Sequence, residues 1–151
     1  MAALSLSTID AAVATRVAAQ LSGFSESPSA SSLMRTPSSI VDKAFVLIIS
    51  SGASLDGTMR GLRQKTLTRI EVPLTVEFAR KLNRSQPATR RAAQDNMQDI
   101  ITALLDVSWT STIGAGGARF MFKSFNFSFA LDGQAIIGQV NFNVSFESSL
   151  T

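Results

Sequence analysis

The chain has 151 residues, of which 45% are apolar and 17% are charged, with a net charge of +3. This size and composition suit one compact domain, which we expect to span residues 1–151. Cysteine and histidine are both absent, which excludes disulfides, thiolate zinc sites, Ser-His pairs and histidine metal sites. No apolar run approaches the roughly 20 residues of a membrane-spanning helix, so we expect a soluble protein made in the cytoplasm.

The first predicted element is a helix over Ser7–Ser22, which Ser7 or Thr8 caps and Gly23 ends. Its apolar stripe consists of Ile9, Val13, Val17 and Leu21. The opposite side is nearly all small and is expected to lie exposed. The following residues, 23–39, are rich in serine and predict a flexible linker within the domain. Two apolar residues of this linker are expected to dock locally, Leu33 and Met34.

Two strands are expected next. Ile40–Ser50 contains an unbroken apolar run, which is typical of a strand covered on both faces. Thr66–Leu82 alternates apolar and polar residues and is expected to pair with the first strand. Pro73 lies in its middle, and because proline cannot donate to a strand ladder, it indicates an edge position or a local bulge.

A long loop, Ser51–Lys65, joins these strands, and it is one part of a strongly basic interval in the middle of the chain. Partner docking is assigned to three of its basic residues and to one residue of the next strand, namely Arg60, Arg63, Lys65 and Arg69. The other basic residues are Arg80, Lys81, Arg84, Arg90 and Arg91, against only Glu71 and Glu77. The interval suits nucleic acid, an acidic protein surface or simply a solvated surface.

A second helix is predicted from Pro87 or Thr89 to Leu105, with the strongest amphipathic pattern in the chain. Its apolar side contains Ala93, Met97, Ile100, Ile101 and Leu104, opposite Asp95, Asp99 and Asp106. These three carboxylates could share a magnesium ion, but a solvated helix face is the expected role. Val107–Ala118 is expected to be a mobile connector, in which Trp109 fills the core.

The last predicted element is a hairpin over Phe120–Phe146 with its turn at Asp132-Gly133. A bulge near Lys123-Ser124 is required to keep the phenylalanines of the first strand on one face. The expected opposite pairs are Phe129 with Ile136, Phe125 with Val140, Phe122 with Phe142, and Phe120 with Val144. Four phenylalanines, Phe125, Phe127, Phe129 and Phe142, are expected in the core under the second helix, against Met97, Ile101 and Leu104.

The other face of this hairpin carries small uncharged polar side chains, Asn126, Ser128, Asn141, Asn143 and Ser145. Such groups form hydrogen bonds without the desolvation cost of a buried charge, so this face is predicted to contact a neighbouring subunit or partner.

Two glycine-containing segments do not predict catalysis. Gly52-Ala-Ser-Leu-Asp56 has no base partner, and Gly114-Ala-Gly-Gly117 lacks a phosphate-loop ending. We therefore expect no enzyme, cofactor or metal site.

The order of elements resembles that of the tail terminator proteins of long-tailed bacteriophages. The resemblance depends on Ala44–Ser50, Leu67–Leu82, Thr89–Leu105 and Phe120–Phe146, which follow one another in that family's order and approximate lengths. It implies an α+β fold in which two helices pack on one side of a mostly antiparallel sheet that ends in a C-terminal β-hairpin.

The same resemblance implies a virion protein that forms a hexameric ring. The ring would bind the tail tube protein at the head-proximal end of the tail, stop tube polymerisation and meet the head-tail connector protein, while viral DNA passes through it without sequence-specific binding. A head-to-tail connector or neck protein of the same particle is the neighbouring alternative. A small basic nucleic-acid-binding module is the second class, and an enzyme is the third.

Overall fold

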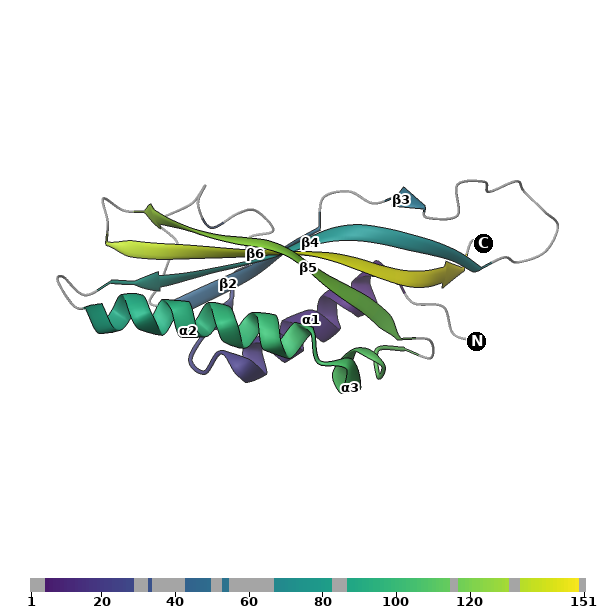
Figure 1. The fold of residues 1–151 in the computed structure, drawn as a ribbon, viewed down its shortest axis with the longest axis horizontal. Helices are drawn as coiled ribbons and strands as arrows, with labels where there is room; N and C mark the ends of the chain where they lie inside the picture. The colour runs from purple at the N-terminus through teal and green to yellow at the C-terminus, as the bar shows by residue number, and fades with distance from the viewer. Residues whose placement is uncertain are drawn as a thin grey trace.

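The sheet of this protein has six strands and carries its helices on one face (Figure 1). The computed structural model describes residues 5–28, 33, 43–49, 53–54, 67–82, 87–114, 117–130 and 134–149. The elements are α1 (Leu6–Gln20), β1 (Ser25–Glu26), β2 (Lys43–Ile49), β3 (Ala53–Ser54), β4 (Leu67–Lys81), α2 (Pro87–Leu104), α3 (Val107–Thr110), β5 (Ala118–Ala130) and β6 (Ala135–Ser149). The strand order is β1-β2-β4-β6-β5, with β3 beside β4, and among the described strand pairs only β1–β2 is parallel. The predicted α+β class, mostly antiparallel sheet and C-terminal hairpin are confirmed.

β4 is the central strand and pairs with β2 on one side and β6 on the other. Its alternation places Val72, Leu74, Val76 and Phe78 in the core beneath the helices. The predicted pairing of the two middle strands is confirmed. Pro73 lies between the part of β4 that pairs with β2 and the part that pairs with β3. Ile49 of β2 is opposite Leu74 and Ala53 of β3 is opposite Glu71, so the register along this edge of β4 shifts by one residue. Proline thus lies at an irregular point of the ladder, as expected for a residue without an N–H donor.

The β5–β6 hairpin has the predicted register. Phe129 is opposite Ile136, Phe125 opposite Val140, Phe122 opposite Phe142 and Phe120 opposite Val144, with a bulge between Phe122 and Ser124. Without this extra residue, every side chain beyond it would change faces. The expected turn at Asp132-Gly133 lies outside the described residues.

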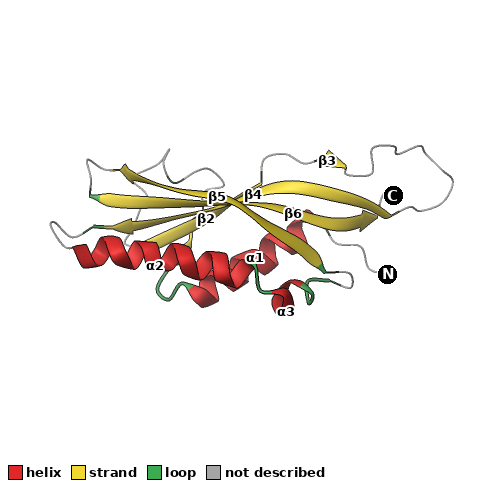
Figure 2. Ribbon diagram, viewed as in Figure 1, coloured by secondary structure: helices red, strands yellow, loops and turns green. Residues whose placement is uncertain are grey.

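The helices differ from the prediction mainly at their ends. Ser5, rather than Ser7 or Thr8, caps α1 and accepts a hydrogen bond from the Thr8 N–H at 3.2 Å. Gly23 has φ +82°, a left-handed conformation that suits the residue after a helix end. A third helix, α3, occupies part of the expected connector. Figure 2 shows α1 and α2 in one layer below the sheet, and the two helices contact each other.

A second, smaller apolar cluster lies on the face of the sheet that the helices do not cover. It contains Leu33, Ala44, Val46, Ala79, Ala135 and Ile137. β2 is therefore covered on both faces, as predicted. Leu33 is fully buried in this cluster, which confirms its expected docking, whereas Met34 lies outside the described residues.

The prediction that four hairpin phenylalanines lie in the core was only partly right. Phe142 is buried and Phe127 is half-buried, but Phe125 and Phe129 are 54% and 63% exposed. The reason is the width of the helix layer: α2 packs over β6, and β5 is the edge strand beyond it. Phe127 is sheltered because its register partner is Gly138, whose missing side chain leaves room for the Phe78 ring. Phe127 packs edge-on against that ring at 6.4 Å.

Candidate interaction surfaces

The five uncharged polar residues of the hairpin share the helix-free face of the sheet, as their alternation predicted. We call Asn126, Ser128, Asn141, Asn143 and Ser145 the polar face. Asn141 is already engaged: its Oδ1 accepts from the Thr75 hydroxyl at 2.8 Å, and its Nδ2 donates to the Ser124 hydroxyl at 3.0 Å. These bonds connect β4, β6 and β5 and hold the surface in one arrangement. Asn126 is exposed, and Asn143 and Ser145 are half-buried.

The polar face continues toward the small apolar cluster through a buried carboxylate. Glu77 on β4 is 0% exposed and accepts a hydrogen bond from Gln139 Nε2 at 3.1 Å. A buried carboxylate requires such partners, because its desolvation is costly. The alternation of β4 did not distinguish Glu77 from an ordinary solvent-facing residue.

Three of the four basic residues assigned to partner docking, Arg60, Arg63 and Lys65, lie outside the described residues. Arg69 is described, and it is exposed near the start of β4. The docking prediction therefore stays a prediction.

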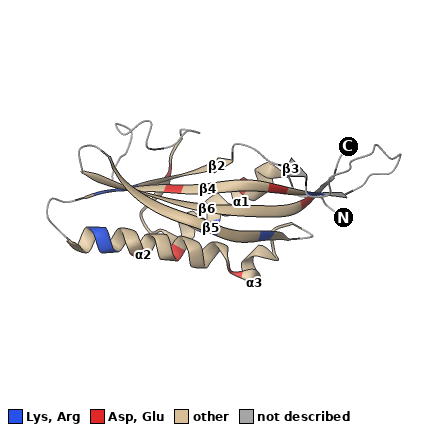
Figure 3. Cartoon of the chain, turned by 45° about the horizontal axis from the view of Figure 1, so that its top comes forward, with Lys and Arg blue, Asp and Glu red and all other residues tan. Residues whose placement is uncertain are grey.

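A second set of basic residues gathers where β4 ends and α2 begins (Figure 3). Lys81, Arg90 and Arg91 are exposed, while Arg80 is half-buried and donates to Asn96 Oδ1 at 3.1 Å. No acidic residue lies in the first turn of α2, so the positive end of the helix dipole adds to these charges. We call Arg80, Lys81, Arg90 and Arg91 the basic end.

The exposed aromatic face of β5 was not predicted as a surface. Phe122, Phe125 and Phe129 are 38%, 54% and 63% exposed, and we call them the Phe row. Phe122 stacks on Phe125 at 6.5 Å, and Phe125 meets Phe127 edge-on at 6.1 Å. At 150–250 Å² for each aromatic side chain, the row presents roughly 300 Å² to solvent. Contiguous apolar patches of this size on a monomer are often functional.

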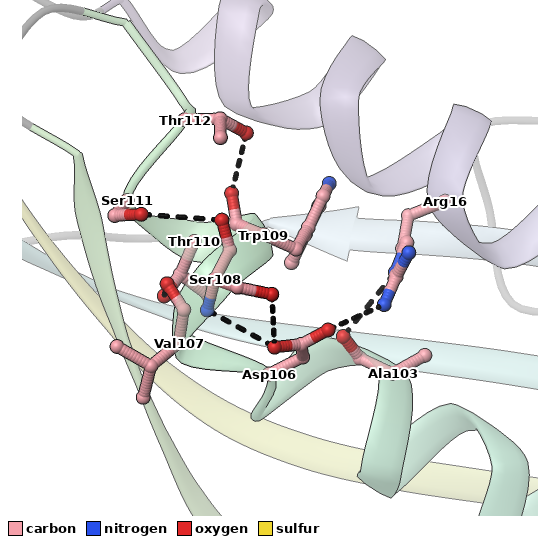
Figure 4. A network of polar contacts seen from close by, with 9 residues as sticks. All are labelled: Arg16, Ala103, Asp106, Val107, Ser108, Trp109, Thr110, Ser111 and Thr112. Atoms are coloured by element: carbon pink, nitrogen blue, oxygen red, sulfur yellow. Dashed lines mark hydrogen bonds and ion pairs between the residues drawn. The ribbon is translucent and has the colours of Figure 1, made fainter.

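Asp106 does not lie on the solvated face of α2, contrary to the prediction. It caps α3, accepting from both the backbone N–H and the hydroxyl of Ser108 at 3.0 Å and 2.7 Å (Figure 4). Arg16 of α1 donates to its Oδ2 at 3.1 Å and to the Ala103 carbonyl at 3.4 Å. The two Ser108 hydrogen bonds, and then the Arg16 charge, hold the pKa of Asp106 below its usual value. One carboxylate thus joins α1, α2 and α3.

A groove lies between α1 and α3 beside this junction. Its α1 wall consists of Thr8, Ala11, Ala12, Thr15, Arg16 and Ala19, and its other wall of Trp109 and residues 112–114. The groove has a volume of about 540 Å³. Trp109, the expected core residue, is half-buried, lying between the Arg16 guanidinium at 5.4 Å and the Phe120 ring at 5.4 Å. We call this feature the α1–α3 groove.

The structure does not bring the predicted carboxylates together, because Asp95 and Asp99 are exposed on α2 while Asp106 caps α3. Within the described ranges there is no cluster of three acidic side chains that could hold a metal ion. Of the two glycine-containing segments, Ser54 lies in β3, while Gly52 and Asp56 are outside the described residues.

No protein-family model matches the chain, and no curated protein matches it. In the part of the chain that the structure describes, no helix combines the length and apolar character needed to cross a membrane.

Proposed function

We propose that this protein is a structural subunit of a long-tailed bacteriophage particle, a tail terminator whose ring caps the tail tube and joins it to the head connector. The proposal is supported by the order of its elements and, above all, by the β5–β6 hairpin. That hairpin leaves the Phe row uncovered on one face and the polar face on the other.

A ring subunit in this position needs two kinds of contact. It must meet its neighbours within the ring, and it must meet different proteins above and below the ring. Two uncovered faces of opposite chemistry on one hairpin suit this requirement, because the apolar one favours lasting contacts and the polar one favours contacts that also tolerate water.

The proposal is tested by cosedimentation with purified tail tubes of the particle. Wild-type protein should bind tube ends and stop further addition of tube protein. A variant with Asn126→Lys and Asn143→Lys should stay folded but lose binding, because each ammonium would be confined in a closed contact. Asn141 is left unchanged, since its bonds to Thr75 and Ser124 stabilise the sheet itself.

The matched control adds the same two charges to an exposed part of α2. Gln94 and Gln98 are both exposed there, so a variant with Gln94→Lys and Gln98→Lys should bind tubes like the wild type. Wild-type protein that never associates with tubes would contradict the tail terminator proposal. Binding to the connector alone would instead favour the neighbouring role of a head-to-tail connector or neck protein.

The basic end favours a second candidate function, a nucleic-acid-binding module. Arg90 and Arg91 are exposed near the start of α2, and Lys81 is exposed at the end of β4. A phosphate backbone would be attracted there by both charge and helix dipole. Such a protein should bind duplex DNA with an affinity that falls steeply with salt. Binding that is lost with Arg90→Ser and Arg91→Ser would favour this function, whereas no binding at low salt would exclude it.

A further inference from the structure

Two apolar surfaces of this chain are uncovered, the Phe row on strand β5 and the α1–α3 groove. We propose that Phe125 and Phe129 of one copy dock into the α1–α3 groove of the next copy. The inference rests on the proposed function and deepens it, because it assigns the contact that would repeat around the ring.

The Phe row lies on a strand that is paired along its length. β5 is held to β6 by a continuous ladder along its length, interrupted by the single bulge. Aromatic contacts from Phe122 through Phe125 to Phe127 and Phe78 hold the Phe125 ring against the core. A pre-ordered aromatic surface loses little side-chain entropy on binding, which favours its use as an anchor.

The α1–α3 groove has matching size and chemistry. Its α1 wall runs from Thr8 to Ala19, roughly 16 Å at about 1.5 Å per residue. Phe125 and Phe129 are roughly 13 Å apart at about 3.3 Å per residue of strand. The spacing of the two rings is therefore within the length of the groove wall. Small side chains, Ala11 and Ala19 among them, line the wall, and Trp109 offers an aromatic surface at the other side.

The two surfaces are too far apart to meet within one copy. Trp109 at the groove packs on Phe120, and Phe129 lies roughly 26 Å further along β5, allowing for the bulge. When the Phe row of each copy occupies the groove of the next copy and not the reverse, the contact is heterologous, and it closes into a ring or grows into a filament. Reciprocal docking of two copies would instead give a closed two-fold dimer, which light scattering distinguishes from a ring by mass.

The size of the Phe row indicates a weak contact for each pair. Its roughly 300 Å² is well below the roughly 800 Å² that each partner buries in a standard stable interface. A closed ring compensates, because every subunit is held on two sides at once. We therefore expect little association in dilute solution and strong association once neighbours or a tail tube hold the subunits together.

Cysteine cross-linking tests the contact directly, since the chain has no cysteine of its own. A Phe129→Cys variant is mixed under oxidising conditions, in turn, with Ala11→Cys, Thr15→Cys and Ala19→Cys variants. Met121→Cys replaces Phe129→Cys in the control, because Met121 is 40% exposed on β5 but belongs to the helix-free face. Cross-linked pairs of Phe129→Cys with a groove variant, in clear excess over the Met121→Cys control, are the expected result.

Two results would overturn the inference. One is preferential cross-linking of Phe129→Cys to itself, which would indicate a two-fold contact, and the other is no excess over the control. Light scattering at high protein concentration, where the weak contact is populated, provides a second measurement. Replacing Phe125 and Phe129 by Ser should weaken self-association by about tenfold for each phenylalanine removed, whereas Met121→Ser should not. Unchanged association of the double variant would also count against the contact.

These outcomes separate the inference from the proposed function. If the Phe125→Ser and Phe129→Ser variant still forms rings on tail tubes, the docking inference fails while the tail terminator proposal stands. If the expected cross-links form but neither the wild type nor any variant binds tail tubes, the docking inference stands and the proposed function fails.

Discussion

The hairpin phenylalanines provide a direct test of where the core ends. Phe142 and Phe129 belong to the same face of the β5–β6 hairpin, but Phe142 is 1% exposed and Phe129 is 63% exposed. Replacing Phe142 with Ala should lower the free energy of unfolding by about 3–5 kcal/mol, because it removes a fully buried ring and leaves a cavity. Full burial of a Phe side chain contributes about 1.5–3 kcal/mol, so the one-third of Phe129 that is covered predicts a loss of about 0.5–1 kcal/mol.

Urea denaturation of both variants measures these losses. Asn126→Ala, on β5 like Phe129, is the reference for an exposed position. The protein must be dilute enough to stay monomeric, because association through β5 would add to the apparent stability. A Phe129→Ala loss as large as that of Phe142→Ala would mean that the edge strand is covered by the domain's own core. The aromatic surface and the docking inference would then both be wrong.

Three further variants test other parts of the fold. Gly138→Ala should destabilise the protein by about 1–3 kcal/mol in thermal unfolding, because the new methyl group would meet the Phe78 ring at 2.5 Å; an unchanged melting temperature would contradict that close approach. Asp106→Ala should lower the melting temperature at pH 7 more than Asp106→Asn, which keeps a capping side chain. Because the folded-state pKa of Asp106 is lowered, its charge stabilises the protein at any pH above the usual aspartate pKa of 3.8. This contribution is lost as the pH falls through the folded-state pKa. The difference between wild type and Asp106→Asn should therefore shrink below about pH 4, and a difference that grows with acid would refute the assignment. Leu33→Ala should cost about 2–5 kcal/mol in chemical denaturation, because the Leu33 side chain is fully buried in the small apolar cluster, and a negligible loss would contradict that burial.

Periodicity alone was sufficient for most of the sheet. The alternation in β4 and in the hairpin set which residues face the helices, and the phase change between Phe122 and Phe125 was enough to locate the bulge. These features are local, because a period of two residues follows from strand geometry itself.

The coverage of the sheet was not predictable in this way. Helices pack about 8–10 Å apart and strands lie about 4.8 Å apart, so two helices cover roughly four strands. The row β1-β2-β4-β6-β5 is longer than that, and the strand left over happens to be the one richest in phenylalanine. Nothing in the alternation of β5 distinguishes an aromatic face under a helix from one beside it.

The α1–α3 groove was missed for a similar reason. The groove depends on Asp106, which follows the end of α2 and caps the start of α3. It also depends on Arg16, which comes from a distant part of the chain and donates a hydrogen bond to Asp106. The aspartate followed the spacing of the acidic side of α2, so its pattern matched a solvated face. Only the three-dimensional position of Arg16 reveals its other role.

The central position of β4 also has a consequence for how the chain folds. Its main partner, β6, lies far along the sequence: Leu67 pairs with Ser149 and Lys81 with Ala135. Native contacts of such wide separation slow the search for the folded state, because much chain entropy is lost before the pairing stabilises anything. We expect the β5–β6 hairpin to form early, since its strands are close in sequence, and β4 to join it in the rate-limiting step. Until then the edge of β4 that faces β6 is unpaired, so the slow step is also the one at which the chain is most prone to aggregate.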